Sequence, residues 1–293
     1  MSNASLRQAV AGLALLVSLA LVACGGASSS GGTHAAADAP RRIVSLSATA
    51  TETLYAIGAG PQVRAVDDQS DFPERAPRTK LSALQPNAEA AAAYRPDLVV
   101  TTGDDRGFVA TLRKLGVPVL VQPAPRTLDE AYAQIARLGA ATGHAAAAKR
   151  LVASMRTRIE ALVERAQPAR GLSVYHELTP EAFSATSQTF IGSIYARFGL
   201  RNVADAAKAA GSGYPQLSRE HILRANPDLI VLADVECCGQ SAAKVARRPG
   251  WARLSAVRAD RIVELDDDVA SRWGPRVTEL VAAVADVVAD LER

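Results

Sequence analysis

The sequence predicts an α/β fold in which two lobes with mostly parallel sheets are joined by one long helix. Residues 87–102 and 218–234 repeat one unit: a capping residue, a glutamate two positions later (Glu89, Glu220), and a Pro-Asp-Leu entry into an apolar run. Short Val/Leu-rich runs alternate with helical patterns, which is typical of βαβ units. The stretch 144–167 has no proline and helical periodicity, so it is predicted to connect the lobes.

The first lobe is predicted to contain four strands. Ser47 or Thr49 is suited to cap the first helix, and Gly116 to separate the last helix from the last strand. Residues 67–80 are polar and hold two prolines, so a loop is expected there. The expected strands are residues 41–47, 63–66, 98–102 and 117–121, and the expected helices are residues 49–57, the segment around Glu89, and residues 108–115.

Two helices are predicted in the middle of the chain, at residues 127–141 and 144–167, separated by Thr142-Gly143. At 1.5 Å per residue the second would span roughly 35 Å, about the diameter of a domain, and Pro168 would end it. A helix of this length between two similar units would hold them nearly rigid. Its apolar residues recur at helical spacing: Leu151, Met155, Ile159, Leu162 and Val163.

The second lobe repeats the alternation of strands and helices. Strands are expected at residues 172–176, 229–233 and 261–265, and helices at residues 190–198, 218–226 and 275–291. The resulting division is an N-terminal lobe at 41–143, a connecting helix at 144–168 and a C-terminal lobe at 169–293.

The amino terminus has the pattern of a targeting segment. Arg7 is its only charge, and residues 9–23 form an apolar run that suits a signal peptide better than a membrane span. The run ends in Leu-Val-Ala-Cys-Gly, which resembles the lipobox of bacterial lipoproteins. The resemblance implies a signal peptide at 1–23, diacylglycerol on the sulfur of Cys24, and a flexible Gly/Ser-rich tether at 24–40. An ordinary secretory signal with a chance cysteine is the alternative.

Composition excludes several functions. The 293 residues carry a formal net charge of +3 with no basic stripe, so no nucleic-acid partner is expected. The chain also has no Gly-rich phosphate loop, no His-Glu-x-x-His and no nucleophile elbow. The histidines are dispersed, so the sequence predicts neither a metal site nor an enzyme; they are His34, His144, His176 and His221.

The order of motifs resembles a known family. In sequence order these are RIVSLSATATETLYAIGAG, QSDFP, RPDLVV, the long helix, YPQLSREHILRANPDLIV and ASRWGPRV. This order is similar to the helix-linked (class III) substrate-binding proteins of ABC importers for vitamin B12, haem and ferric siderophores, and close in layout to the cobalamin-binding member. The resemblance covers residues 41–291. It implies two Rossmann-like lobes, one long connecting helix, a ligand in the cleft between the lobes, and no cofactor or covalent chemistry.

Ligands of open α/β sheets bind beyond the carboxyl ends of the strands. Matching against the cobalamin binder places six residues at ligand-contact positions, with Trp273 as a further apolar platform: Gln69, Thr102, Phe183, Tyr214, Asp268 and Arg272. Gln69 and Thr102 stand where the cobalamin binder has aromatic residues, so fewer stacking faces are expected.

Several of these assignments have alternatives. The three aromatic residues are otherwise lobe-core residues. Asp268 and Arg272 are otherwise an internal ion pair, and residues 266–268 a solvated turn.

The two repeated glutamates carry a second implication of the resemblance. In the family, one glutamate on each lobe docks into arginine pockets of the two permease subunits, and Glu89 and Glu220 match those positions. Two acidic groups on similar lobes suit a partner with two-fold symmetry. The alternative is that each glutamate only complements its helix dipole, which contributes about 0.3–1 kcal/mol.

Cys237 and Cys238 follow a predicted strand and are expected in a loop at the mouth of the cleft. In an oxidising compartment such neighbours can close a vicinal disulfide. Two free thiols, metal binding and intermolecular bonding are the alternatives.

Together these observations predict an exported, monomeric binding protein. It would be lipid-anchored to the cell membrane, facing the periplasm or cell exterior, and would deliver a corrinoid, haem or ferric chelate to a permease dimer with its ATPase. A metal-ion receptor of the related helix-linked class and a lipid-anchored α/β hydrolase are the alternatives. The hydrolase would need a serine hydrogen-bonded to His176 or His221.

Overall fold

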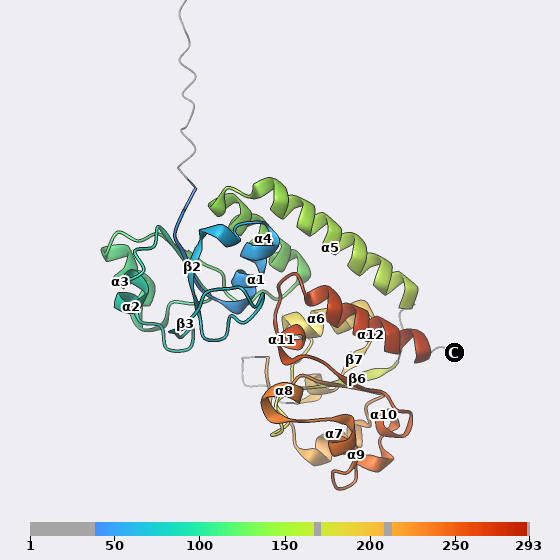
Figure 1. The fold of residues 1–293 in the computed structure, drawn as a ribbon. Helices are drawn as coiled ribbons and strands as arrows, with labels where there is room; N and C mark the ends of the chain where they lie inside the picture. The colour runs from blue at the N-terminus through green and yellow to red at the C-terminus, as the bar shows by residue number, and fades with distance from the viewer. Residues whose placement is uncertain (1–38, 167–170, 208–212, 292–293) are drawn as a thin grey trace, which may run out of the picture. The chain divides into compact units, whose positions relative to one another are not determined.

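The computed structural model describes residues 39–166, 171–207 and 213–291 (Figure 1). The predicted signal peptide, the lipidation site Cys24, the tether up to residue 38 and the helix stop at Pro168 lie outside these residues.

The first sheet has five strands in the order β3-β2-β1-β4-β5, and all four pairings are parallel. Four strands match the prediction, but β3 lies in the segment predicted as a loop, so that expectation is wrong. β3 reads RTKL and pairs with β2 at the edge of the sheet, where charged side chains are tolerated and leave no apolar signal. The strands are β1 (Ile43–Leu46), β2 (Val63–Asp67), β3 (Arg78–Leu81), β4 (Leu98–Thr101) and β5 (Val119–Val121).

The second sheet has four parallel strands in the order β7-β6-β8-β9. Its central strands β6 and β8 are buried along their whole length, although only β8, which reads LIVL, is an apolar run. The strands are β6 (Ser173–Glu177), β7 (Arg201–Asn202), β8 (Leu229–Leu232) and β9 (Ile262–Glu264). Two parallel sheets in one chain confirm the predicted fold class. We refer to the parts built on them as the N-terminal and C-terminal lobes.

Five helices, α1, α2, α4, α6 and α7, begin at polar caps. Their cap residues Ser47, Asn87, Thr127, Thr189 and Ser218 each accept a hydrogen bond from a backbone N–H three residues later. The main helices are α1 (Ala48–Ala56), α2 (Ala88–Ala92), α3 (Phe108–Lys114), α4 (Leu128–Thr142), α5 (Ala145–Ala166), α6 (Phe190–Arg197), α7 (Arg219–Ala225) and α12 (Val277–Leu291). Short 3₁₀ helices occupy Gly60–Gln62, Asp105–Gly107, Val203–Ala206 and Trp251–Arg253.

Helix α5 is the predicted connecting helix. Its 22 residues span about 33 Å, and it packs along α4 on one side and α12 on the other (Figure 1). Gly143, with φ of 80°, ends α4 and lets the chain reverse into α5. Met155 and Ile159 are fully buried in a core that includes Leu54 of α1 and Val284 of α12. The connecting helix is therefore part of a core shared by both lobes.

Four short helices of the C-terminal lobe were not expected: α8 (Val235–Cys238), α9 (Ala242–Ala246), α10 (Ser255–Arg258) and α11 (Asp267–Ser271). Each is one turn or little more, too short for a periodic apolar pattern. Cys237 and Cys238 end α8, so the expectation that they lie in a loop is wrong. The alternative of a solvated turn at 266–268 is also wrong, because the Asp266 side chain caps α11 by accepting from two backbone N–H groups.

Candidate functional site

The two lobes meet at the carboxyl ends of their strands, where residues after β9 contact residues after β2. Arg272, which is 12% exposed, is the centre of this contact. Its guanidinium donates to the backbone oxygen of Gln69 at 2.8 Å, to Glu52 Oε1 at 3.0 Å and to Asp71 Oδ1 at 3.3 Å. It also pairs with Asp268 Oδ1 at 2.5 Å. Three of the predicted ligand-contact residues are therefore joined directly, and the alternative of an internal Asp268–Arg272 pair is realised.

A second arginine reinforces the same contact. Arg276 Nη2 lies 2.8 Å from Glu52 Oε1, and its guanidinium lies over the ring of Phe72, 4.4 Å from the centroid. Glu52 is 3% exposed, so one buried carboxylate of the N-terminal lobe balances two arginines of the C-terminal segment. Burial raises the pKa of Asp268 to about 6, although Arg272 opposes the shift. The contact is a buried ionic network, which sequence reasoning missed at Glu52 and Arg276.

The predicted aromatic platforms divide into two groups. Phe183 and Tyr214 are each 39% exposed and lie on two segments that run antiparallel, linked through Phe183 and Gln216. Partial burial raises the pKa of Tyr214. Trp273 instead donates from Nε1 to Gln134 Oε1 of α4 at 3.0 Å and packs against the shared core. This placement matches the alternative in which Trp273 is a core residue.

Thr102 lies half-buried just after β4, and no contact joins it to the other predicted ligand residues. Its position just beyond the carboxyl end of β4 is the one expected for a ligand-contact residue.

Glu89 and Glu220 occupy equivalent positions, each exposed in the first turn of a capped helix. The pKa of Glu220 is lowered by a hydrogen bond from its own backbone N–H, and Arg219 adds to the effect at 3.6 Å. Both glutamates are exposed, and among the described residues no hydrogen bond or ion pair joins either one to another element.

A buried charged cluster lies at the carboxyl ends of β6 and β8. Glu177 is fully buried. Nη1 and Nη2 of Arg248 each donate to one of its carboxylate oxygens at 2.6 Å, and the Tyr175 hydroxyl donates to it at 3.0 Å. Asp234 is also fully buried, and neither of its oxygens accepts a hydrogen bond. Burial, and then the neighbouring Glu177, raise the pKa of Asp234 to about 7. Little in the sequence points to this cluster beyond Glu177 at the end of a predicted strand.

Cys237 and Cys238 are joined by a disulfide in the structure, and both residues are exposed. Helix α8, which they end, begins directly after Asp234, so the pair sits next to the buried cluster at the carboxyl end of β8.

The histidines have structural contacts. His176 is fully buried, its Nδ1 lies 2.7 Å from the Tyr195 hydroxyl, and burial lowers its pKa to about 4. His221 Nε2 lies 2.9 Å from the backbone oxygen of Val203. Neither ring is bonded to a serine, so nothing favours the hydrolase alternative. Within the described residues no group of three or more His, Cys, Asp or Glu residues is arranged to hold a metal ion.

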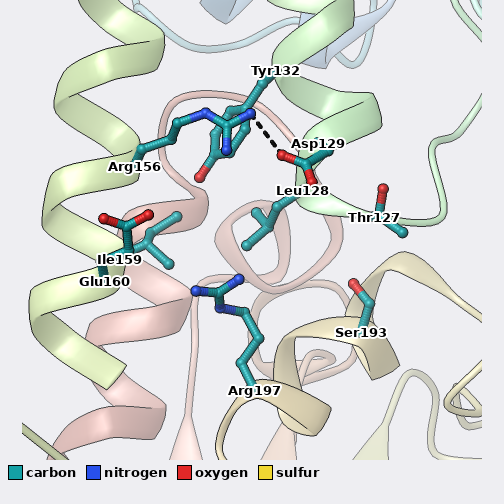
Figure 2. Close-up of a pocket in the computed structure, with 9 residues that line it drawn as sticks. All are labelled: Thr127, Leu128, Asp129, Tyr132, Arg156, Ile159, Glu160, Ser193 and Arg197. Atoms are coloured by element: carbon teal, nitrogen blue, oxygen red, sulfur yellow. Dashed lines mark ion pairs between the residues drawn. The ribbon is translucent and has the colours of Figure 1, made fainter. Parts of the chain in front are cut away.

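A pocket of about 240 Å³ lies away from the predicted ligand residues, between α4, α5 and α6 (Figure 2). Figure 2 shows Arg156 paired with Asp129 at 2.6 Å and lying over the ring of Tyr132, while Arg197 extends into the pocket from α6. None of the predicted ligand-contact residues lines it.

None of the helices in the described ranges combines the length and the apolar character needed to cross a bilayer.

Comparison with known proteins places the chain in a family. Residues 43–269 match the family model described as periplasmic binding protein. An ABC transporter substrate-binding lipoprotein of Bacillus subtilis, YvrC, is 30% identical over 85% of this chain and 80% of its own length. A cobalamin-binding protein of Halobacterium salinarum is 29% identical over 84% of this chain and 69% of its own length.

A solved structure shares the fold. The periplasmic haem-binding protein RhuT of Roseiflexus, in its apo form, aligns with a TM-score of 0.74 and 26% identity, over 86% of this chain and 99% of its own. These relatives are binding proteins, and they confirm the prediction that the chain is not an enzyme. With two parallel sheets, a connecting helix and a match over most of its length, the chain belongs to the periplasmic binding protein family of ABC transport systems.

Proposed function

We propose that the chain is an extracytoplasmic receptor that captures a corrinoid, haem or ferric chelate between its lobes and delivers it to an ABC permease. The observation that carries the proposal is the placement of Phe183 and Tyr214. Both are aromatic and partly exposed, and Phe183 follows β6 while Tyr214 follows β7. Because the strands of this sheet are parallel, both residues follow carboxyl ends on the same edge as the end of β9, after which Arg272 lies. Exposed aromatic faces suit the flat, largely apolar surface of a macrocycle.

The names of two relatives support a large metal chelate as the ligand. One is named for cobalamin and another for haem, both of which are large planar metal chelates. Because the donors of Arg272 are occupied by groups of the protein, we assign it to holding the Gln69 loop in place. The Gln69 side chain is exposed and supplies polar contact to the ligand.

Ligand capture is tested by colour. The purified protein is mixed with cobalamin, haem or ferric siderophores, passed through a desalting column, and its visible spectrum is recorded. A retained chromophore and a raised melting temperature are expected for one class, because a ligand that binds only the folded state stabilises it. If no member of the panel is retained or raises the melting temperature, the ligand assignment is wrong.

Variants locate the site. Replacing Phe183 or Tyr214 with alanine is expected to raise Kd about two- to tenfold, since an aromatic contact contributes about 0.5–1.5 kcal/mol. Leu115→Ala is the control, because Leu115 is 54% exposed but follows α3, away from the strand ends. Equal Kd values for all three variants and the unmodified protein would place the ligand elsewhere.

Docking to the permease is assigned to Glu89 and Glu220. Reversing both charges to lysine is expected to abolish uptake while ligand affinity survives. Glu279→Lys is the matched control, because Glu279 is also exposed in the first turn of a helix and would complement its dipole equally. Uptake that persists in the double variant would refute docking. Equal loss in the control would assign the effect to helix stability.

The anchor is assigned to Cys24. Cys24→Ser is expected to release the protein from the membrane fraction and to remove incorporation of labelled fatty acid. The division into lobes at 41–143 and 169–293 with a connecting helix at 144–168 is part of the same proposal.

A further inference from the structure

The cysteine pair is accessible to reagents in solution. Cys237 and Cys238 are both exposed, and their disulfide closes a ring between neighbouring residues at the end of α8. Apart from Cys24 they are the only cysteines in the chain. Within residues 41–293, thiol–disulfide exchange can therefore take place only at Cys237 and Cys238.

Helix α8 depends on contacts outside itself. Four residues are too few for a stable helix, because nucleation is unfavourable. The carboxylate of Asp267 accepts from the backbone N–H of Glu236 at 3.1 Å and from that of Cys237 at 2.7 Å. The short helix that carries the cysteines is thus bonded to the start of α11.

Helix α11 leads from this contact to the other lobe. Asp268, the next residue, pairs with Arg272, and Arg272 donates to the backbone oxygen of Gln69 in the N-terminal lobe. A continuous series of bonds therefore runs from the backbone of Cys237 to the loop that carries Gln69. Along it lie three of the residues that the sequence placed at ligand-contact positions, Asp268, Arg272 and Gln69.

We propose that Cys237–Cys238 is a thiol–disulfide exchange site whose oxidation state controls the ligand affinity of the receptor through Asp267, α11 and Arg272. The disulfide restricts the backbone of α8 and keeps its N–H groups directed at Asp267. Reduction removes the ring, α8 loses order, and α11 is held less firmly. The proposal rests on the function assigned above, because it takes Gln69 and Arg272 as parts of the ligand site.

The reductant of the Cys237–Cys238 disulfide is a partner protein with two closely spaced, exposed cysteine thiols. One of its thiolates attacks a sulfur of the pair, forms a mixed disulfide and releases the other cysteine as a thiolate, which takes up a proton. Its second thiol then displaces the first receptor sulfur. The net exchange transfers two electrons and two protons to the receptor, while the dithiol becomes a disulfide.

The first test does not need a ligand. Hydrogen exchange of the α11 amides, including those of Ala270 and Arg272, is measured in the full chain before and after reduction, with alkylation and mass spectrometry to verify each state. We expect reduction to accelerate their exchange about fivefold or more, the lower end of typical coupling between sites. The variant with both cysteines replaced by serine is expected to match the reduced protein and to ignore reductant. If verified reduction leaves α11 exchange unchanged, or if the pair stays alkylatable after oxidation, the proposal is wrong.

The second test adds cobalamin and haem. Reduction is expected to raise Kd about fivefold or more, and Asp267→Ala is expected to raise it in both oxidation states and abolish the difference between them. A Kd that is independent of oxidation state contradicts control of affinity. A receptor that binds neither ligand contradicts the proposed function instead, while the amide exchange still decides whether α8 and α11 are coupled.

Discussion

Asp234 makes stability depend on pH in a predictable direction. It is fully buried beside Glu177, and its pKa is raised from 3.8 to about 7, first by burial and then by the neighbouring carboxylate. A proton on Asp234 would turn it into a donor to Glu177, whereas the ionised form has no donor to bind. The folded protein therefore holds this proton more tightly than the unfolded chain does.

The sign follows from linkage. Between pH 4 and pH 7 the folded state carries one more proton than the unfolded state, so the free energy of unfolding falls as pH rises. Each pH unit costs about 1.4 kcal/mol, so three units give an upper value of about 4 kcal/mol, and the loss is complete above pH 7. Asp234→Asn removes the titration and keeps a donor beside Glu177.

The assay is urea unfolding followed by circular dichroism from pH 5 to pH 8.5. The stability of Asp234→Asn relative to the unmodified protein is expected to rise by about 1.4 kcal/mol per pH unit up to pH 7 and then to level off. Asp260→Asn is the control, because Asp260 is exposed and asparagine accepts its positive φ of 55°. Parallel curves for the unmodified protein and Asp234→Asn would refute the assignment of a buried, protonated carboxyl group.

Three substitutions test the packing between and within the lobes. Glu52→Gln leaves Arg272 and Arg276 without their shared buried carboxylate, and it is expected to lower the free energy of unfolding by about 3–5 kcal/mol in urea titration. Ile159→Ala, in the buried face of the connecting helix, is expected to cost about 2–5 kcal/mol by the same measurement. Gly192→Ala would place a methyl group 2.1 Å from a backbone oxygen, so a lower melting temperature and a loss of about 1–3 kcal/mol are expected.

The first two substitutions have controls that separate the named cause from a general effect of substitution. Glu279→Gln removes an exposed charge, and Arg158→Ala truncates an exposed residue of the same helix as Ile159; both are expected to change stability by less than about 0.5 kcal/mol. A loss at Glu52 no larger than that at Glu279 would mean that the ionic network does not hold the lobes. An unchanged melting temperature in Gly192→Ala would mean that the backbone there gives way without cost.

The parts of the fold that the sequence predicted are those with a strong local signal. Strands β1, β4 and β8 are short runs rich in Ile, Leu and Val, and the connecting helix has a long helical period. Strand β3 was missed because an edge strand reading RTKL has no such run. Helices α8 and α11 were missed because contacts from elsewhere in the chain, rather than their own propensity, keep them folded.

In the candidate site, too, residues within a recognisable motif were predicted, and residues that depend on distant partners were not. Gln69, Asp268 and Arg272 were placed by motif and are joined in the structure. Glu52, the buried carboxylate that also binds Arg272, lies more than 200 positions away from it in the sequence. No local pattern connects residues so far apart. Whether Arg272 faces a ligand or holds the lobes together depends on that distant carboxylate, so the sequence left both readings open.

The position of α12 has a consequence for how the molecule is made. Helix α12, the last in the chain, packs along α5, and Arg165 forms an ion pair with Asp286 across this contact. The amino-terminal half of the chain is synthesised first. The apolar side of α5 that packs against α12 therefore stays uncovered until residues 277–291 have left the ribosome. Contacts between such distant segments slow folding. Loss of residues 277–291 would leave that side of α5 exposed permanently, and chaperones that bind apolar segments of nascent chains are expected to bind it.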